Sequence, residues 1–186
     1  MATPVFAARR RFGPQAGERW TRYVAWARLP QLRELVSLDT MLCPAFPEEL
    51  TSDDWQHNVH ADYQVTHFHS LDHLRGRIAG VDGLNLLAIL REPSVDDLGR
   101  VLLPGFSFAG FDLLDVHGDV SALTNCGGFD DVFGPEELNP LGLLDERARA
   151  VAVRRRLRAE YPDQHHAICD VWAIWRWAGP APATSG

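Results

Sequence analysis

Histidines provide the densest group of potential metal ligands in this sequence. They fall within a short span that also contains a carboxylate, at positions His57, His60, Asp62, His67, His69 and His73. A helical conformation would place His57 and His60 on one face, and an extended conformation would point His67 and His69 to one side. Imidazole nitrogens in two such pairs are ligands that zinc prefers. These two pairs, His57 with His60 and His67 with His69, therefore form a candidate site for a divalent metal such as zinc. The corresponding function, a metal-dependent hydrolase, is the alternative to the leading hypothesis given below.

A simpler interpretation of the same histidines requires no metal. Their spacing matches no recognised zinc motif such as H-E-x-x-H, and the residues between them show no other zinc signature. Imidazoles are also common on half-exposed surfaces. Surface and boundary histidines with satisfied hydrogen bonds are the favoured interpretation, and the leading hypothesis includes no cofactor.

A second group combines a thiol with imidazoles. The run 121–129, Ser-Ala-Leu-Thr-Asn-Cys-Gly-Gly-Phe, contains Cys126 followed by two glycines. If the preceding strand lies beside the last strand of the chain, Cys126 meets His165 and His166, which would make it the nucleophile of a thiol enzyme. The glycine amides would then stabilise an oxyanion. The favoured alternative is structural, because Asn and Gly suit a sharp turn and free thiols such as Cys169 are usually buried.

A third group consists of carboxylates without nearby positive charge. The window 112–146 contains nine acidic residues and neither Arg nor Lys. Grouped carboxylates speed the encounter with a cationic partner and hold it when its Arg or Lys side chains desolvate them. The alternative is that acidic residues simply complement helix dipoles. The leading hypothesis is a non-catalytic protein-binding function, in which a basic protein docks on a loop centred on Asp130, Asp131, Glu136 and Glu137.

The composition is that of one folded domain. Its 186 residues include 46% hydrophobic and 10% aromatic residues, enough to bury a core. Apolar runs such as 84–90 are far shorter than the roughly 20 residues that cross a bilayer, and no signal-peptide pattern follows the first arginines. A net charge of -7 disfavours nucleic acid as a partner. Three cysteines without a C-x-x-C pair argue against a disulfide framework, so a cytoplasmic location is the expectation.

Three regions follow from the distribution of residue types. Residues 1–17 are predicted to be a loosely ordered Arg-rich arm, 18–178 a single domain, and 179–186 a flexible tail. Apolar spacing predicts a helix over 18–27, and a second short helix over 31–38 after Pro30.

Capping residues predict where further helices begin. Ser70 precedes an apolar stripe and is expected to cap a helix that ends near Gly80. Pro47 and Pro135, each followed by two glutamates, also look like helix starts. Asp145 is the predicted N-cap of the last helix.

Alternating or continuous apolar runs predict the strands. They cover 84–90, 106–115, 119–125 and 167–177, and the second and third are joined by a tight turn at 117–118. The last strand has apolar residues on both faces, which indicates a central position. The predicted fold is α+β, with a mostly antiparallel sheet of about four or five strands packed by helices.

Part of the chain resembles a known class of proteins. The segment 106–176 contains the runs Gly-Phe-Asp-Leu-Leu-Asp at 110–115, Ser-Ala-Leu-Thr-Asn-Cys-Gly-Gly-Phe at 121–129 and Val-Trp-Ala-Ile-Trp-Arg at 171–176. It is similar to small bacterial proteins, including immunity proteins that neutralise secreted polymorphic toxins, which tend to be compact, acidic and α+β. The resemblance implies an immunity protein whose basic partner is a toxin domain, and it transfers no functional residue.

Overall fold

A five-stranded antiparallel sheet forms the centre of the protein. The computed structural model describes residues 3–59, 66–101, 103–116, 120–125 and 131–178. The strand order is β2-β1-β3-β5-β4, and every neighbouring pair is antiparallel. The elements are, in chain order, β1 (Val5–Arg10), η1 (Pro14–Ala16), α1 (Glu18–Ala27), β2 (Ala45–Phe46), α2 (Ser52–His57), α3 (Leu71–Arg77), β3 (Leu84–Arg91), α4 (Val95–Arg100), β4 (Phe106–Asp115), η2 (Pro135–Glu137), α5 (Arg147–Glu160), η3 (His165–Ala167) and β5 (Cys169–Trp177). This arrangement confirms the predicted α+β fold.

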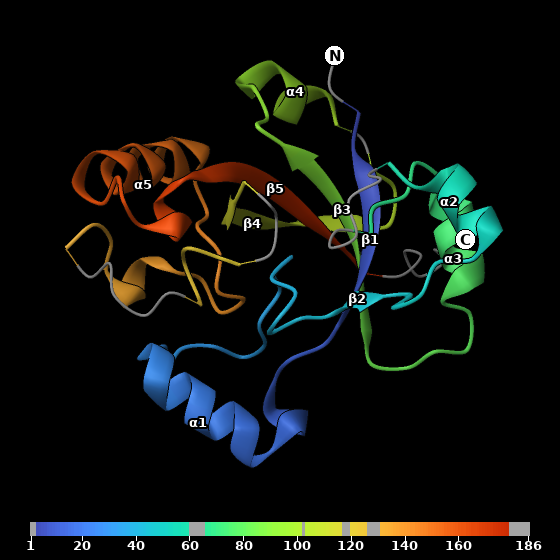
Figure 1. The fold of residues 1–186 in the computed structure, drawn as a ribbon, viewed down its shortest axis with the longest axis horizontal. Helices are drawn as coiled ribbons and strands as arrows, with labels where there is room; N and C mark the ends of the chain where they lie inside the picture. Colours follow the sequence, from blue (N-terminus) through green and yellow to red (C-terminus); the bar gives the residue numbers. More distant parts are fainter. Residues whose placement is uncertain (1–2, 60–65, 102, 117–119, 126–130, 179–186) are drawn as a thin grey trace, which may run out of the picture.

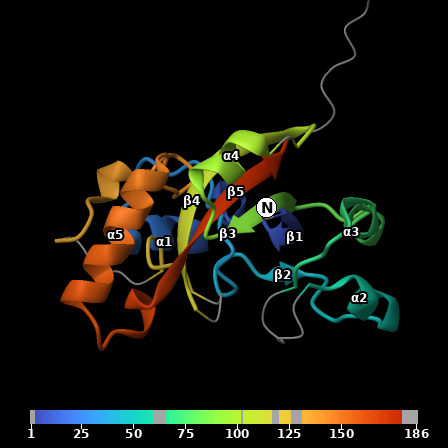
Figure 2. The same ribbon diagram turned by 90° about the horizontal axis from the view of Figure 1, so that it is seen from above.

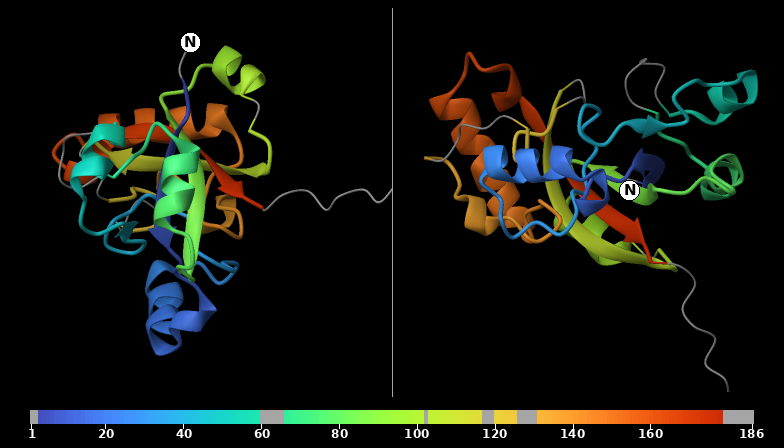
Figure 3. Two further views of the ribbon diagram at one scale, coloured as in Figure 1. Left: turned by 90° about the vertical axis from the view of Figure 1, so that its right-hand side faces the viewer. Right: turned by 90° about the horizontal axis from the view of Figure 1, so that it is seen from below.

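The helices lie around the sheet (Figure 1). Helices α2 and α3 lie at one end of the molecule and α5 at the other, with the strands between them (Figures 1 and 2). Helices α1 and α4 occupy opposite extremes in the other direction (Figure 3). Within the described part of the chain, no helix is long and apolar enough to cross a membrane.

Strand β5 holds the core together because both of its faces are buried. Ala173 and Val171 pack on the side that carries α5, where Val153 and Leu157 are fully buried. Ile174 packs on the opposite side, in a separate apolar cluster. This confirms the central position predicted for the last strand, since β5 lies between β3 and β4. Burial of each of these valine, leucine and isoleucine side chains stabilises the fold by about 1.5–3 kcal/mol.

The N-terminal segment is part of the core, so the prediction of a loosely ordered arm is wrong. Strand β1 pairs with β2 on one side and β3 on the other. Ala7 and Ala8 are completely buried, and the Arg9 side chain is 1% exposed. The arginines at 9–11 suggested a solvated segment. The short apolar run from Val5 to Ala8, however, is typical of a strand that is buried on both faces. The predicted tail, 179–186, lies outside the described residues.

Several predicted elements agree with the structure. Helix α1 matches the predicted range, α3 begins after Ser70, whose Oγ accepts a hydrogen bond from the backbone N–H of His73, and β3 and β4 match their predicted runs. Pro135 opens the short helix η2. Helix α5 begins after Glu146 instead of Asp145.

Other predicted elements do not form. The segment 31–38 is irregular, and its Leu35 makes a bridge to Phe12 that buries it. Pro47 follows β2, and the next helix begins later, after Thr51. The segment 120–125 is a turn with one bridge at Ser121 and is no strand, while the predicted tight turn at 117–118 lies outside the described residues. At Leu35 and Ser121 a bridge to another strand or segment replaced the local preference.

A buried polar network fixes the 120–125 turn to the sheet. Asp112 on β4 is fully buried and accepts hydrogen bonds from the hydroxyls of Ser37 and Ser121, the latter at 2.6 Å. Asp39 accepts from the backbone N–H of Ser121 and the side chain of Asn125, both at 2.9 Å. Two buried carboxylates thus hold segments far apart in the sequence.

Burial raises the pKa of Asp112 to about 6, and the nearby Asp39 charge adds to the increase, against hydrogen bonds from Ser121, Ser37 and Leu113 that lower it. A carboxyl whose pKa is raised in the folded state contributes stability that is complete below its ordinary value of 3.8. That contribution is lost as the pH rises toward 6.

We expect Asp112→Asn to remove this pH dependence. Between pH 4 and 7 the free energy of unfolding of the variant should gain about 3 kcal/mol relative to the wild type, because about two pKa units correspond to that amount. Urea unfolding at several pH values measures the difference, with the exposed Asp163→Asn as the matched control. Parallel curves for wild type and Asp112→Asn would contradict the assignment.

Candidate functional site

Two short helices bring one carboxylate and two imidazoles together. Asp53 and His57 lie one turn apart on α2, and His73 lies on α3. One potential ligand atom from each residue lies within 4.8 Å of the other two. The rings of His57 and His73 are stacked, with centroids 4.1 Å apart and an interplanar angle of 19°. This Asp53–His57–His73 cluster lies at the end of the molecule formed by α2 and α3 (Figure 2).

Helix caps place these residues. Thr51 and Asp54 form a capping box at the start of α2, in which the Thr51 hydroxyl accepts from the Asp54 backbone N–H at 3.2 Å. Ser70 caps α3 in the same way through the N–H of His73. The cluster therefore lies in the first turns of the two helices, except for His57 at the end of α2.

A buried carboxylate, Asp54, joins the two helices. Its Oδ1 accepts a hydrogen bond from Arg77 Nε at 2.7 Å and lies 3.1 Å from His73 Nε2. Its Oδ2 accepts from the backbone N–H and the hydroxyl of Thr51, both at 2.8 Å. Burial raises the pKa of Asp54, but the hydrogen bonds from Thr51, Arg77 and His73 outweigh it and lower the pKa to about 2. Asp54 is therefore ionised and acts only as an acceptor.

The ionised Asp54 selects the tautomer of His73. An acceptor at 3.1 Å requires His73 to carry its proton on Nε2, which leaves the lone pair of the neutral ring on Nδ1. That nitrogen lies 3.7 Å from Asp53 Oδ2. A carboxylate behind a histidine is the usual second layer of protein metal sites, where it fixes the ring and strengthens the ligand. His73 is thus oriented as a metal ligand would be.

The cluster is open on one side. The side chain of Asp53 is 72% exposed, whereas that of His73 is 11% exposed and His57 is half-buried. Zinc–nitrogen bonds of about 2.1 Å place tetrahedral ligands roughly 3.4 Å apart, so the three side chains must close by about an ångström. The two imidazoles must also tilt out of their stack. The exposed Asp53 has the freedom to make most of this adjustment.

The described histidines of the predicted metal site lie in different environments, although the backbone N–H of His69 donates to the His57 carbonyl at 3.1 Å. His67 is 1% exposed and packs 5.5 Å from the ring of Trp172, while His69 is exposed. Phe68 between them pairs with Phe6 of β1, which turns His67 toward the sheet. Among the described residues, no group of three potential metal ligands includes His67 or His69. A site shared by His57, His60, His67 and His69 stays a prediction, because His60 lies outside the described residues, as does Asp62.

Sequence reasoning missed the two partners that His57 has in the structure. Asp53 four residues before His57 was a usable signal, since positions i and i+4 share a helix face. The contact with His73 had no comparable signal, because it depends on how α3 packs on α2. His73 belonged to the histidine group but not to the predicted ligand set.

The thiol hypothesis stays a prediction, and the described residues place only the other two cysteines. Cys43 and Cys169 are buried, and burial raises the pKa of each thiol to about 12. Neither forms a hydrogen bond to an imidazole within the part of the chain that the structure describes. His165 lies 3.3 Å from Asp115 in an ion-pair geometry. Cys126 lies outside the described residues, and so does the side chain of His166.

The acidic loop is largely compensated by the protein itself. Glu137 forms an ion pair with Arg149, which lowers the pKa of Glu137, and accepts the backbone N–H of Gly134 at 2.9 Å. Asp131 accepts the hydroxyl of Tyr161 at 2.6 Å. The expectation of uncompensated carboxylates is wrong for Glu137, because α5 supplies a guanidinium that the window itself lacks.

Two further members of the acidic window are not on the surface at all. Asp112 and Asp115 are buried, with exposed fractions of 0% and 2%. Glu136 is exposed, and Asp130 lies outside the described residues. Docking of a basic protein on this loop stays a prediction.

Comparisons with known proteins identify no relative of this chain. No protein-family model matches it, and neither a curated protein nor a solved structure matches it. The resemblance to immunity proteins stays a prediction, and the chemistry of the Asp53–His57–His73 cluster is the remaining guide to function.

Proposed function

We propose that this protein is a metal-dependent hydrolase that binds a divalent transition-metal ion such as zinc through Asp53, His57 and His73. The observation that carries the proposal is the hydrogen bond between His73 and the buried, ionised Asp54. This bond orients His73 so that its Nδ1 lies toward Asp53, 3.7 Å from Oδ2, while the His57 ring lies against the face of the His73 ring.

The ligand set favours a catalytic over a structural metal. Structural zinc sites use four protein ligands, whereas catalytic sites use three and leave one position for water. The cluster offers two imidazoles and one carboxylate, and its exposed Asp53 side is open to solvent. A zinc ion held by one carboxylate keeps a net positive charge, which lowers the pKa of its water to about 7 and makes hydroxide available for hydrolysis.

The rearrangement that metal binding requires is small. Rotating a side chain by about 30° from its preferred rotamer costs on the order of 1 kcal/mol. Structural zinc in peptides releases roughly 10–16 kcal/mol, so even a weaker three-ligand site exceeds the cost of tilting two rings. Asp54 keeps His73 in place meanwhile, because three other hydrogen bonds, from Thr51 and Arg77, hold its carboxylate.

We expect one equivalent of zinc to bind to the metal-free protein in calorimetric titration. His57→Ala and His73→Ala should each weaken binding by at least 100-fold, because each removes one of three ligands. His69→Ala is the matched control, since His69 is exposed and close in sequence but outside the cluster. Less than a tenth of an equivalent bound by the wild type, or a loss caused by His69→Ala alone, would overturn the proposal.

We expect Asp54→Asn to weaken zinc binding by about 10–100-fold although Asp54 is not a ligand. An amide would no longer hold His73 in the required tautomer as strongly. Thr51→Ala separates this effect from loss of the helix cap, because it removes the cap but keeps the contact between Asp54 and His73; its expected cost is about 1 kcal/mol of stability. Equal zinc affinities for the two variants would show that Asp54 acts only on folding.

We expect the zinc-loaded protein to hydrolyse an activated ester, 4-nitrophenyl acetate, faster than an equal concentration of free zinc. The reason is that the ligand set leaves a position for water. The zinc-dependent rate should disappear in His57→Ala and persist in His69→Ala. If the wild type binds zinc but hydrolyses the ester no faster than His57→Ala, the metal site is supported and the hydrolase function is contradicted.

A further inference from the structure

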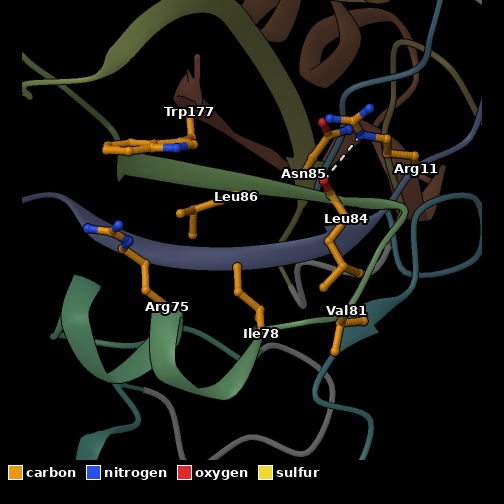
Figure 4. A pocket seen from close by; sticks show the side chains of 8 residues that line it. All are labelled: Arg11, Arg75, Ile78, Val81, Leu84, Asn85, Leu86 and Trp177. Carbon is orange, nitrogen blue, oxygen red and sulfur yellow. Dashed lines mark hydrogen bonds between the residues drawn. The ribbon is translucent and has the colours of Figure 1, made fainter. Parts of the chain in front are cut away.

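A separate cavity lies on the other side of α3 from the Asp53–His57–His73 cluster. It is lined by Arg11, Arg75, Ile78, Val81, Leu84, Asn85, Leu86 and Trp177 and has a volume of about 220 Å³. Arg75 and Ile78 project from the face of α3 opposite His73, since two and five residues along a helix turn the side chain away. Figure 4 shows these side chains between α3, β3 and the end of β5. The cavity is thus independent of the proposed metal site.

Part of the wall of this cavity is apolar (Figure 4). Leu84 and Leu86 point from the same face of β3, and Ile78 and Val81 close the space from the α3 side (Figure 4). The indole of Trp177 lines the cavity at the end of β5. Aliphatic side chains on two sides and an aromatic ring on another fit an apolar ligand body, and an aromatic ring is suited to stacking against the indole.

The aromatic wall is held in a fixed position. A Cβ atom at Gly105 would lie 2.5 Å from the Trp177 ring, so glycine permits the chain to pass directly against it. Gly105 also has φ 81°, a backbone conformation that favours glycine. Phe106 contacts the same ring edge-to-face, with centroids 5.0 Å apart. Because the Trp177 ring is already fixed, ligand binding would cost little side-chain conformational entropy.

The charge at the cavity is positive. The Arg75 guanidinium lies 5.2 Å from the centroid of the Trp177 ring, and no described acidic residue forms an ion pair with it. Arg11 donates from Nε to the Leu84 carbonyl at 3.1 Å and lies 3.8 Å from Glu34. Glu34 is shared, because it also accepts from Arg176 at 2.8 Å. Because Arg11 and Arg176 share the single carboxylate of Glu34, this side of the cavity keeps a net positive charge. Arg75 adds a further positive charge.

We propose that this cavity binds a small aromatic carboxylate. The ring would occupy the apolar part of the cavity against Trp177, and the carboxylate would accept two parallel hydrogen bonds from the planar guanidinium of Arg75. Pockets for drug-sized ligands have volumes of roughly 300–1,000 Å³, so a cavity of about 220 Å³ fits a smaller ligand, such as a single ring with a short acidic arm. The cation–π contact holds Arg75 at the edge of the site until the anion arrives.

Calorimetric titration with phenylacetate, phenylacetamide and acetate tests both halves of this ligand. Phenylacetate should bind at least 10-fold more tightly than phenylacetamide, which lacks the charge, and than acetate, which lacks the ring. Arg75→Gln should weaken phenylacetate at least 10-fold and leave phenylacetamide unchanged. Arg155→Gln, an equally exposed arginine on the distant α5, should change neither.

Filling the cavity gives a second test. Val81→Trp should abolish binding of phenylacetate, while His57→Ala should leave it unchanged, which separates this site from the proposed metal centre. The proposal is overturned if phenylacetate and phenylacetamide bind equally, if acetate binds as tightly as phenylacetate, or if Arg75→Gln binds phenylacetate like the wild type. Because Arg75 is exposed, its variant decides the matter even if Val81→Trp fails to fold.

Discussion

Burying a carboxylate costs several kcal/mol unless hydrogen bonds or an opposite charge replace water, and the protein meets this constraint in two ways. Asp54 is surrounded by donors from Thr51, His73 and Arg77 and stays ionised. Among the described residues, Asp112 accepts hydrogen bonds from the hydroxyls of Ser37 and Ser121, and burial raises its pKa to about 6. The first solution orients an imidazole between two helices, and the second fixes a turn to the sheet.

Helix α3 connects the two candidate sites. One of its faces presents His73 to α2, and the other presents Arg75 and Ile78 to the cavity beside β3. Leu74 between them is completely buried against Ala8 and Leu86, which fixes the helix on the sheet. A single buried leucine thus determines where both sets of polar side chains are presented.

The distribution of charge shows how a sequence window can mislead. Residues 112–146 contain no basic residue, yet Arg149 and Arg156 of α5 lie over the loop and donate to Glu137 and to the backbone carbonyl of Val132. Helix α5 follows immediately in the chain and folds back onto the segment. Net charge within a window predicts the surface potential only when no neighbouring element covers that window.

The sequence by itself determined the elements whose signals are local. Ser70 predicted α3, and the apolar runs at 84–90 and 167–177 predicted two interior strands, because capping and burial patterns act over a few residues. Tertiary structure alone decided that 5–10 enters the sheet and that Asp54 meets His73, 19 residues away. The physical reason is that burial and charge pairing depend on which distant segments come into contact, and residue spacing along the chain does not specify that.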